Sequence, residues 1–387
     1  MKLRFGICGL GFAGSVLMAP DLKEHPDIDL VAACDPNTDV RERFGHDYRI
    51  PTFPNLTDML SSTNLDGVYI ASPHQHHCEQ VLEAAEKGLH IIIEKPLAIH
   101  MEDAQKMAVA VSRANVHLVV GPSRGNDPAI RRMRELVLSG DVGKVAMVNC
   151  WNFTDFLYRP RRPEELDTSL GGGIVYNQLP HQIDCIKTIT GQAIAAVRAT
   201  VGALDPERPT EGHCTAFLTL SGGAAATMVY SGYDHFDSDE FQFWLNEGGL
   251  PKQAAHGNAR RLLSTHQGSE AELRVQRYGY GGPISKFLAS SQADRKQSHF
   301  GTLIVTCEKA DLRPSKDGVL IYGHEGVREI PAERTSNNRM GDTTIQELVD
   351  AVRGKHAALR DAVWGKETLQ VCHAILESSR TGRQIEL

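Results

Sequence analysis

The sequence predicts an α/β protein in two parts, a doubly wound parallel sheet followed by an α+β domain with a large, mostly antiparallel open sheet. Strand-like and helix-like stretches alternate at first, and strand-like runs dominate after about residue 144. Such alternation with short links is typical of a parallel sheet covered on both faces, and a later series of strands indicates a separate domain. We therefore expect residues 1–122 to form the first domain and residues 123–387 the second.

The strands expected in the first domain are apolar runs, at Leu3–Cys8, Leu30–Cys34, Gly67–Ala71, His90–Ile93 and His117–Gly121. Between them, residues 78–88 and 101–116 have helical periodicity, and Gly88 is placed to end the first of these helices. The stretch 127–143 then predicts a helix with Asp127 as its cap and Pro128 at its first position.

The second domain is expected to hold seven strand-like segments, at residues 144–153, 196–204, 214–220, 225–233, 241–245, 302–308 and 318–330. Residues 343–354 and 367–382 have the pattern of amphipathic helices. Residues 248–299 are polar with little periodicity, so this insertion is interpreted as a surface excursion, a lid or a disordered segment.

Composition excludes several classes of function. The chain has 387 residues, 41% hydrophobic and 23% charged, as in ordinary globular proteins. A net charge of −7 argues against a nucleic-acid partner, and no apolar run approaches the roughly 18 residues that span a bilayer. The N-terminal stretch breaks early into glycines, which argues against a signal peptide. Eight cysteines stand singly without a C-x-x-C motif, so we expect a reduced, cytoplasmic protein.

A glycine motif follows the first expected strand. Its predicted dinucleotide contacts are Gly9, Gly11, Phe12, Ala13 and Gly14. Asp35 ends the second strand, where an acidic side chain accepts hydrogen bonds from the adenosine ribose and repels a 2′-phosphate. This arrangement is typical of a Rossmann domain and favours NAD(H). Arg41 and Arg43, which do not directly follow Asp35, leave NADP(H) as an alternative.

Further segments extend the pattern over both halves of the chain: "SPHQHH" (72–77), "EKPLA" (94–98) and "GGGIVYNQLPHQID" (171–184). With these, the chain resembles the Gfo/Idh/MocA oxidoreductases. The resemblance implies that the cofactor is bordered by Ser72, Pro73, His74, His77, Glu94 and Lys95. It also implies that Lys95 lies beside the nicotinamide and takes a proton from a substrate hydroxyl.

The same resemblance implies a second catalytic residue, His181. The family has an Asp four residues before this His, and here that position is Asn177. Asn cannot supply the charge that stabilises an imidazolium, but it can fix the ring tautomer by hydrogen bonding. We therefore expect His181 to act as a neutral hydrogen-bond partner or proton relay.

Several loop segments resemble the 4,5-dihydro-4,5-dihydroxyphthalate dehydrogenase branch of the family, among them 152–168, 205–212, 231–241 and 307–323. Those enzymes oxidise a cis-dihydrodiol with two carboxylates to a catechol. Guanidinium groups bind carboxylates through paired hydrogen bonds, so the predicted substrate-binding residues are Arg124, Arg159, Arg161 and Arg162, together with His181. For the loop that holds Arg159, Arg161 and Arg162, the alternative is a solvated basic loop ion-paired to Glu164 and Glu165. Residues 121–130 depart from that branch, with Pro122 and Arg124 where His-rich sequence is expected, so a substrate with other acid groups or another ring is a further alternative.

The sequence thus predicts an NAD-dependent dehydrogenase acting on a small molecule, a carboxylated cyclic diol. An inositol or sugar dehydrogenase, a glycosidase or lyase that uses NAD⁺ transiently, and a non-catalytic NAD-binding protein remain alternatives. The "HQHHC" stretch at 74–78 is not expected to bind metal, because a loop and helix start cannot bring all four side chains to one ion. The resemblance also implies a homodimer or homotetramer.

Overall fold

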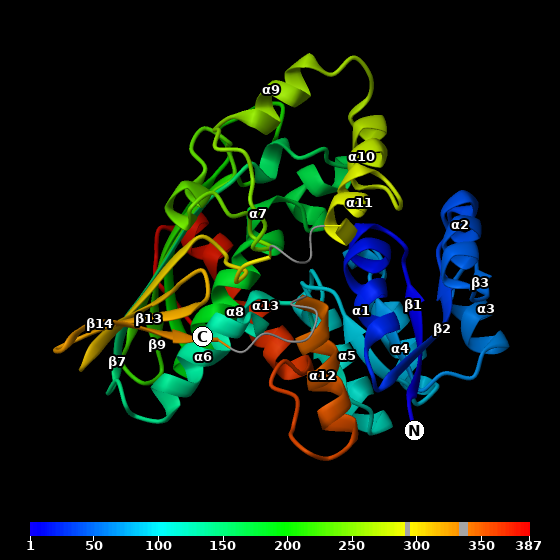
Figure 1. The fold of residues 1–387 in the computed structure, drawn as a ribbon, viewed down its shortest axis with the longest axis horizontal. Helices are drawn as coiled ribbons and strands as arrows, with labels where there is room; N and C mark the ends of the chain where they lie inside the picture. The colour runs from blue at the N-terminus through cyan, green and yellow to red at the C-terminus, as the bar shows by residue number, and fades with distance from the viewer. Residues whose placement is uncertain (291–294, 333–339) are drawn as a thin grey trace. The chain divides into compact units, whose positions relative to one another are not determined.

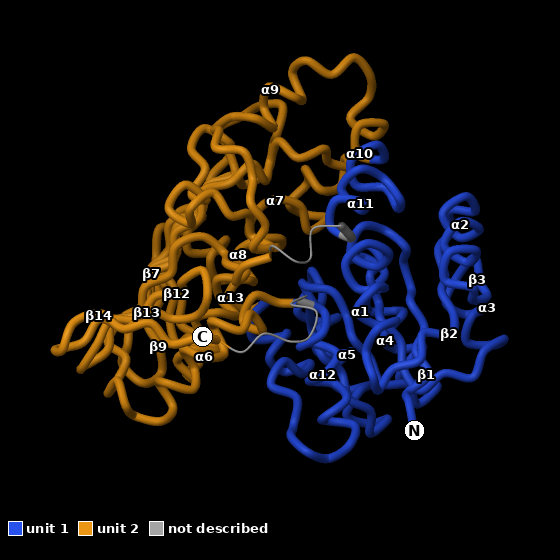
Figure 2. Tube along the Cα trace, in the orientation of Figure 1, with its two compact units in different colours: residues 1–122, 275–290, 339–369 blue, residues 123–274, 291–338, 370–387 orange. Residues whose placement is uncertain are grey.

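The computed structural model describes residues 1–290, 295–332 and 340–387, so residues 291–294 of the predicted insertion lie outside the described residues. The chain forms two compact units, which Figure 2 distinguishes by colour. Unit 1 comprises Met1–Pro122, Val275–Ser290 and Arg339–Leu369, and unit 2 comprises Ser123–Arg274, Ser291–Asn338 and Gln370–Leu387. The sequence range 123–387 therefore contributes residues to both units.

Unit 1 is built on a parallel sheet of six strands in the order β3-β2-β1-β4-β5-β6 (Figure 1). The strands are β1 (Leu3–Cys8), β2 (Ile28–Cys34), β3 (Thr52–Phe53), β4 (Gly67–Ile70), β5 (His90–Ile93) and β6 (Leu118–Val120). Every residue of β4 and of β6 is buried, and three isoleucines of β5 are fully buried. Near-continuous apolar runs of this kind are typical of parallel strands covered on both faces, and the doubly wound sheet is confirmed.

Helices cover this sheet. They are η1 (Phe12–Met18), α1 (Ala19–Glu24), α2 (Thr38–Tyr48), α3 (Leu56–Ser62), η2 (His74–His76), α4 (His77–Glu86), α5 (Met101–Ala114), α11 (Pro283–Ser290) and α12 (Met340–Val352). The late helix α12 belongs to this unit because Ile345, Leu348 and Val349 join the core formed by Phe5 and Ile7. Helices α10 (Glu270–Tyr278) and α13 (Ala362–Thr381) each cross the division between the units.

Unit 2 is built on a sheet of nine strands in the order β14-β13-β12-β11-β7-β10-β9-β8-β15. The strands are β7 (Val145–Phe153), β8 (Ile194–Gly202), β9 (His213–Leu220), β10 (Ala225–Ser231), β11 (Thr302–Cys307), β12 (Ala310–Pro314), β13 (Gly318–Gly323), β14 (Gly326–Pro331) and β15 (Ile385–Glu386). Neighbouring strands are antiparallel except for β10 and β7. The predicted large, mostly antiparallel sheet is confirmed.

One face of this sheet is covered. Along β9, β10 and β11, buried residues alternate with more exposed ones, as expected for a sheet with one face against the core. Helix α8 (Leu179–Thr190), whose residues are all buried, lies against β7 and β10, and α6 (Pro128–Leu138) packs beside α8. The remaining helices are η3 (Arg124–Asn126), η4 (Phe156–Tyr158), η5 (Pro163–Leu166), η6 (Thr168–Leu170), α7 (Gly173–Asn177), η7 (Ser238–Gln242) and α9 (Asn258–Thr265).

One local prediction was wrong. Residues 241–245 form the end of η7 and a turn rather than a strand, and Phe243 and Trp244 have positive φ angles of 60° and 55°. The insertion holds the helices α9, α10 and α11 despite its weak periodicity. The predicted cap Asp127 and first-turn Pro128 of α6 are confirmed, although the Asp127 side chain makes no capping hydrogen bond. In the described part of the chain, no helix has the length and apolarity needed to cross a membrane.

Candidate active site

The glycine loop joins β1 to η1, and its three glycines have different neighbours. Gly9 has φ 98°, a backbone conformation that residues with a side chain rarely adopt. A Cβ on Gly14 would lie 1.9 Å from the carbonyl oxygen of Gly9, so the loop itself requires that glycine. A Cβ on Gly11 would meet no protein atom within 4 Å. This open space at Gly11 fits the close approach of a pyrophosphate to the backbone.

Asp35 follows β2, and its carboxylate organises the neighbouring turns. Its Oδ2 accepts a hydrogen bond from the backbone N–H of Leu10 at 2.8 Å, and its Oδ1 accepts one from Asn37 at 2.8 Å. A carboxylate has further lone pairs that can receive ribose hydroxyls. Arg41 donates from Nη1 to the carbonyl oxygens of Asp35 at 2.7 Å and Pro36 at 2.9 Å. The Arg41 guanidinium is thus engaged by the turn itself, which agrees with NAD(H) rather than NADP(H).

The other predicted cofactor residues follow β4 and β5. Ser72, Pro73 and His74 come after β4, and Glu94 and Lys95 come after β5. The strand order places β2, β1, β4 and β5 side by side. All of these turns therefore lie at the carboxyl edge of one parallel sheet, which is where such sheets bind ligands.

His77 joins two of these turns. The side chain is fully buried, with Nδ1 3.1 Å from the carbonyl oxygen of Pro96 and Nε2 3.1 Å from that of Ser72. Burial lowers the pKa of His77 to about 4, although the neighbouring carbonyls favour the imidazolium. We interpret the ring as holding the two turns in register. Through these contacts it acts on the backbone of both turns, and its predicted place at the border of the cofactor stays a prediction.

Glu94 supports the turn that carries Lys95. Its Oε1 accepts a hydrogen bond of 2.6 Å from the hydroxyl of Tyr69, a fully buried residue of β4. Burial raises the pKa of Glu94, and the charge of Lys95 and the phenol of Tyr69 oppose that rise. The peptide bond between Lys95 and Pro96 is cis. Lys95 thus stands on a short turn braced by Glu94 on one side and by His77 on the other.

In unit 2, the predicted catalytic residues lie where α7 meets α8. The Asn177 side chain donates from Nδ2 to the carbonyl oxygens of Gly171 and Gly173, both at 2.8 Å. Both amide N–H groups are therefore used by the glycine turn. The only Asn177 side-chain atom left for the His181 ring is therefore the acceptor Oδ1. If Asn177 fixes the His181 tautomer as predicted, it must do so by accepting a hydrogen bond from a ring N–H.

Phe300 connects two predicted residues, His181 and Arg124. The Phe300 ring centroid lies 5.0 Å from that of His181 and 5.7 Å from the guanidinium carbon of Arg124. A fourth buried residue, Tyr230, stacks on Phe300 at 6.1 Å. Phe300 and Tyr230 were missed in the sequence because neither belongs to a motif, and only the fold brings them to His181. We call His181, Arg124, Phe300 and Tyr230 the His181 cluster.

Glu247 links this cluster to a second arginine. Arg124 donates from Nη1 to the backbone carbonyl of Glu247 at 2.7 Å and from Nη2 to its Oε2 at 3.3 Å. Burial opposes ionisation, but Arg159 and Arg124 hold the pKa of Glu247 below its ordinary value. Arg159 also donates from Nε to Asp155 at 2.7 Å. The side chain of Arg159 is 28% exposed against 8% for Arg124, so Arg159 is the more accessible cation.

The other two predicted arginines have different partners. Arg161 lies 3.5 Å from Glu165, and Arg162 lies 3.4 Å from Glu165 and 3.2 Å from Glu164. The guanidinium of Arg161 also stacks on the Phe156 ring, 3.7 Å from its centroid. These are the contacts of the alternative interpretation, an ion-paired loop. A role in substrate binding stays a prediction for all four arginines.

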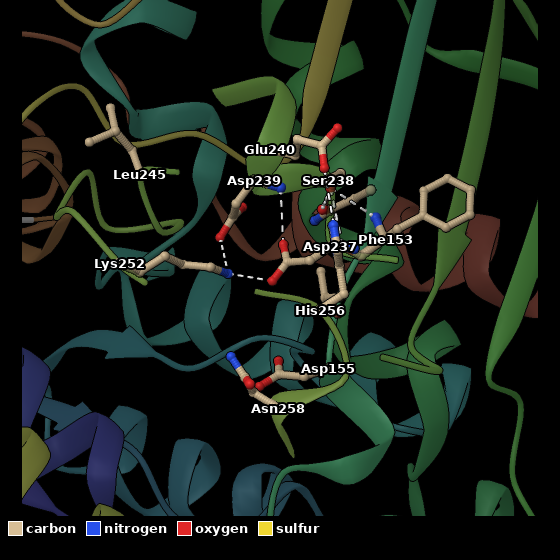
Figure 3. A network of polar contacts seen from close by, with 12 residues as sticks. Phe153, Asp155, Asp237, Ser238, Asp239, Glu240, Leu245, Lys252, His256 and Asn258 are labelled. Carbon is tan, nitrogen blue, oxygen red and sulfur yellow. Dashed lines mark hydrogen bonds and ion pairs between the residues drawn. The ribbon is translucent and has the colours of Figure 1, made fainter. Parts of the chain in front are cut away.

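An additional acid–base network lies in the segment after β10. Figure 3 shows Lys252 between two carboxylates, with Nζ 2.5 Å from Asp237 and 2.6 Å from Asp239. Burial raises the pKa of Asp239 to about 7 against the attraction of Lys252. The sequence did not reveal this network, because Lys252 follows the two acids by 15 and 13 positions, and no local pattern links them.

No metal centre was expected at residues 74–78, and His76 and His77 there have different partners. His76 pairs with Glu79 at 2.9 Å, whereas the His77 ring contacts backbone carbonyls. Among the residues that the structure describes, no group of three or more His, Cys, Asp and Glu side chains is placed to hold a metal ion.

Known proteins resemble this chain over nearly its whole length. A family model described as an oxidoreductase family with an NAD-binding Rossmann fold matches residues 3–122, and the GFO/IDH/MocA C-terminal domain matches residues 130–250. The 1-carboxy-3-chloro-3,4-dihydroxycyclohexa-1,5-diene dehydrogenase of Comamonas testosteroni is 35% identical over 98% of this chain and 95% of that protein.

Solved structures of other proteins have the same fold. The crystal structure of a protein described as a dehydrogenase from Bordetella bronchiseptica RB50 has 64% identity and a TM-score of 0.97 over 100% of both chains. An oxidoreductase from Agrobacterium radiobacter, solved with NAD⁺, L-tartaric acid and magnesium, has 16% identity and a TM-score of 0.74 over 100% of this chain and 98% of that one. At this identity the second likeness concerns the fold alone. By its full-length similarity and its two matching domains, the chain belongs to the Gfo/Idh/MocA family of NAD-dependent oxidoreductases.

Proposed function

We propose that this chain is a dehydrogenase that oxidises one CH–OH group of a carboxylated cyclic cis-dihydrodiol and yields the catechol. The observation that carries the proposal is the full-length similarity to the Comamonas enzyme. That enzyme is named for a ring with a carboxyl group, two hydroxyls on neighbouring carbons and two ring double bonds. The similarity includes both the turns around Lys95 and the segment around His181.

Lys95 is the proposed proton acceptor. Bound NAD⁺ supplies the hydride acceptor for the carbon that is oxidised. The Lys95 amine takes the hydroxyl proton onto Nζ, and this requires the neutral amine at the moment of reaction. The turn that carries Lys95 is braced by Glu94 and His77, so the amine starts from a fixed backbone position. Positioned bases of this kind contribute about 10² to 10⁴ in rate.

The product of this step is a ring ketone that still carries two double bonds. It enolises to an aromatic catechol, so the chemistry after oxidation is strongly downhill. His181 needs only to hold or relay a hydroxyl proton, and a neutral imidazole can do this. A neutral imidazole needs no negative charge beside it, which fits Asn177 in place of the Asp expected from the family. The Asn177 amide is instead engaged by the glycine turn.

Arg124 and Arg159 are the proposed carboxylate-binding residues. They flank Glu247 beside the His181 cluster, and Arg159 is partly accessible. Two cations offer partners for two carboxylates, which supports the 4,5-dihydro-4,5-dihydroxyphthalate branch as the finer assignment. A substrate with one carboxylate, like that named for the Comamonas enzyme, would use a single arginine.

A substrate panel tests the proposal. Purified protein with NAD⁺ is given dihydrodiols with two, one or no carboxylates, myo-inositol and a simple sugar, and NADH formation is followed by absorbance. We expect NADH from the carboxylated dihydrodiols, fastest with two carboxylates, and little from the uncharged diol. NADH from inositol or sugar alone would refute the substrate assignment. Product formed without NADH would instead point to a lyase or glycosidase.

A further inference from the structure

A late segment of the chain belongs to the cofactor-binding unit. Residues Val275–Ser290 fall in unit 1 with Met1–Pro122, although more than 150 residues separate them in sequence. They include the end of α10 and the helix α11, which Figure 2 shows in the colour of unit 1. The sequence offered no reason to assign part of the polar insertion to the dinucleotide domain.

Tyr280 anchors this segment to α2, the helix that follows Asp35. Its hydroxyl donates to Asp47 at 3.0 Å, and its ring lies 5.4 Å from Phe44 and 5.6 Å from the guanidinium carbon of Arg43. The next residue, Gly281, fits tightly against Arg43, since a Cβ there would lie 2.0 Å from Nη2. Arg43 is therefore a support for this segment.

Tyr278 reaches the glycine loop itself. Its ring meets that of Phe12 edge to face, with 5.5 Å between centroids and 82° between planes. Phe12 follows Gly11, the glycine at which the protein leaves open space. The segment is thus held at two points, at α2 by Tyr280 and at the glycine loop by Tyr278.

Arg277 brings a positive charge to the same place. Its guanidinium carbon lies 5.8 Å from the Tyr278 ring centroid, and its side chain is partly exposed. Within the described part of the chain no carboxylate pairs with Arg277, whereas the nearby Arg274 is paired with Glu165 at 2.9 Å. A guanidinium without an acidic partner, beside a loop that binds pyrophosphate, matches the chemistry of phosphate recognition.

We propose that residues 275–282 form a strap over the glycine loop, in which Arg277 binds the pyrophosphate of NAD(H) and Tyr278 slows its release. The proposal rests on NAD binding by unit 1 and not on the identity of the substrate. It assigns a retention role to part of an insertion that lies outside both matching family models.

Binding measurements test the strap without turnover. Dissociation constants for NADH, ADP-ribose and adenosine, and the NADH release rate, are measured by fluorescence or competition for Arg277→Gln and Tyr278→Ala. Arg113→Gln and Val109→Ser, two residues of α5 of which Arg113 is exposed and Val109 is 54% exposed, serve as controls. Melting temperatures without cofactor verify that each variant folds.

We expect Arg277→Gln to weaken NADH and ADP-ribose by about tenfold. Adenosine, which has no phosphate, should be unaffected. Tyr278→Ala should speed NADH release by about fivefold or more, and the controls should stay within about twofold of the parent. Unchanged binding of ADP-ribose by Arg277→Gln would overturn the proposal, even if Tyr278→Ala had an effect, because packing against Phe12 alone could explain the latter.

Discussion

At the scale of single residues, Asn177 shows how one substitution can change a side chain's task. The family pattern places an acid here, but the Asn177 amide donates two hydrogen bonds of 2.8 Å to the carbonyls of Gly171 and Gly173. A carboxylate has no such donors and would face both carbonyl oxygens. In this chain the residue thus stabilises the glycine turn before α7, and position 177 places no charge near His181.

Replacing this residue tests that role. Asn177→Asp should lower the free energy of unfolding by more than about 2 kcal/mol, because two hydrogen bonds worth roughly 1 kcal/mol each are lost and a charge is, in addition, placed against the carbonyl oxygens. Asn177→Ala, which loses the bonds without adding charge, should fall between the two. Urea unfolding of the parent and of both variants measures their free energies of unfolding and so gives their order of stability. An Asp variant as stable as the parent would show that the amide contacts contribute nothing.

Lys95 carries the proposed chemistry. Lys95→Ala should reduce turnover of the dihydrodiol by at least about 10², while the dissociation constant for NADH changes little. Lys106→Ala is a matched control, since that lysine of α5 is exposed and forms an ion pair with Asp103 of the same helix. Near-normal turnover in the Lys95 variant would remove this residue from the reaction.

At the scale of elements, the active edge of unit 1 depends on contacts between turns that follow different strands. His77 at the start of α4 links the turn after β4 to the turn after β5 through carbonyls of Ser72, Pro96 and Leu97. Because burial lowers its pKa to about 4, the ring stays neutral in the folded protein at pH values where an unfolded chain begins to protonate it.

The neutral His77 ring makes the free energy of unfolding fall as the pH is lowered. The unfolded state, with a His pKa near 6.5, binds more protons than the folded state between about pH 6.5 and pH 4. This contribution to stability is therefore complete above pH 6.5 and is lost as the pH falls towards 4, by roughly 3 kcal/mol in all. In His77→Asn, urea midpoints should depend less on pH over this range. His46→Asn, whose side chain is 89% exposed, should keep the parent's slope.

The elements also show what local sequence can reveal. Five strands of unit 1, the glycine loop and the positions of Asp35 and Lys95 followed from apolar runs and turn residues, because these signals lie within a few residues of each other. The two-residue strand β3 (Thr52–Phe53) was not predicted, because it is too short to form an apolar run. Phe300 and Tyr230 could not be recognised, since Phe300 meets His181, and Tyr230 meets Phe300, only in the folded chain, with many residues between them in the sequence. The predicted strand at 241–245 failed because its apolar residues serve a turn with left-handed Phe243 and Trp244.

At the scale of the whole molecule, each of the two units is built from three segments that are separated in the sequence. Unit 1 contains residues 275–290 and 339–369 in addition to the N-terminal 122 residues. The cofactor-binding unit is therefore complete only when most of the chain has been synthesised. Ile345 and Leu348 of α12 are fully buried in its core. Ligand binding to unit 1 therefore acts on a unit assembled from three separate segments, and cofactor should stabilise all three together.

Cofactor-dependent stability measures this coupling and the choice of cofactor at once. NADH at a hundred times its dissociation constant should raise the free energy of unfolding of unit 1 by about 2.7 kcal/mol, seen as a higher melting temperature. NADPH at the same concentration should raise it much less, because its 2′-phosphate would meet the Asp35 carboxylate, and Arg41 is held by the carbonyls of Asp35 and Pro36. Asp35→Ser should narrow the difference between the two cofactors, whereas Asp39→Ser, an exposed residue in the first turn of α2, should leave it unchanged. Equal stabilisation of the parent protein by NADPH and NADH would show that Asp35 does not select the cofactor.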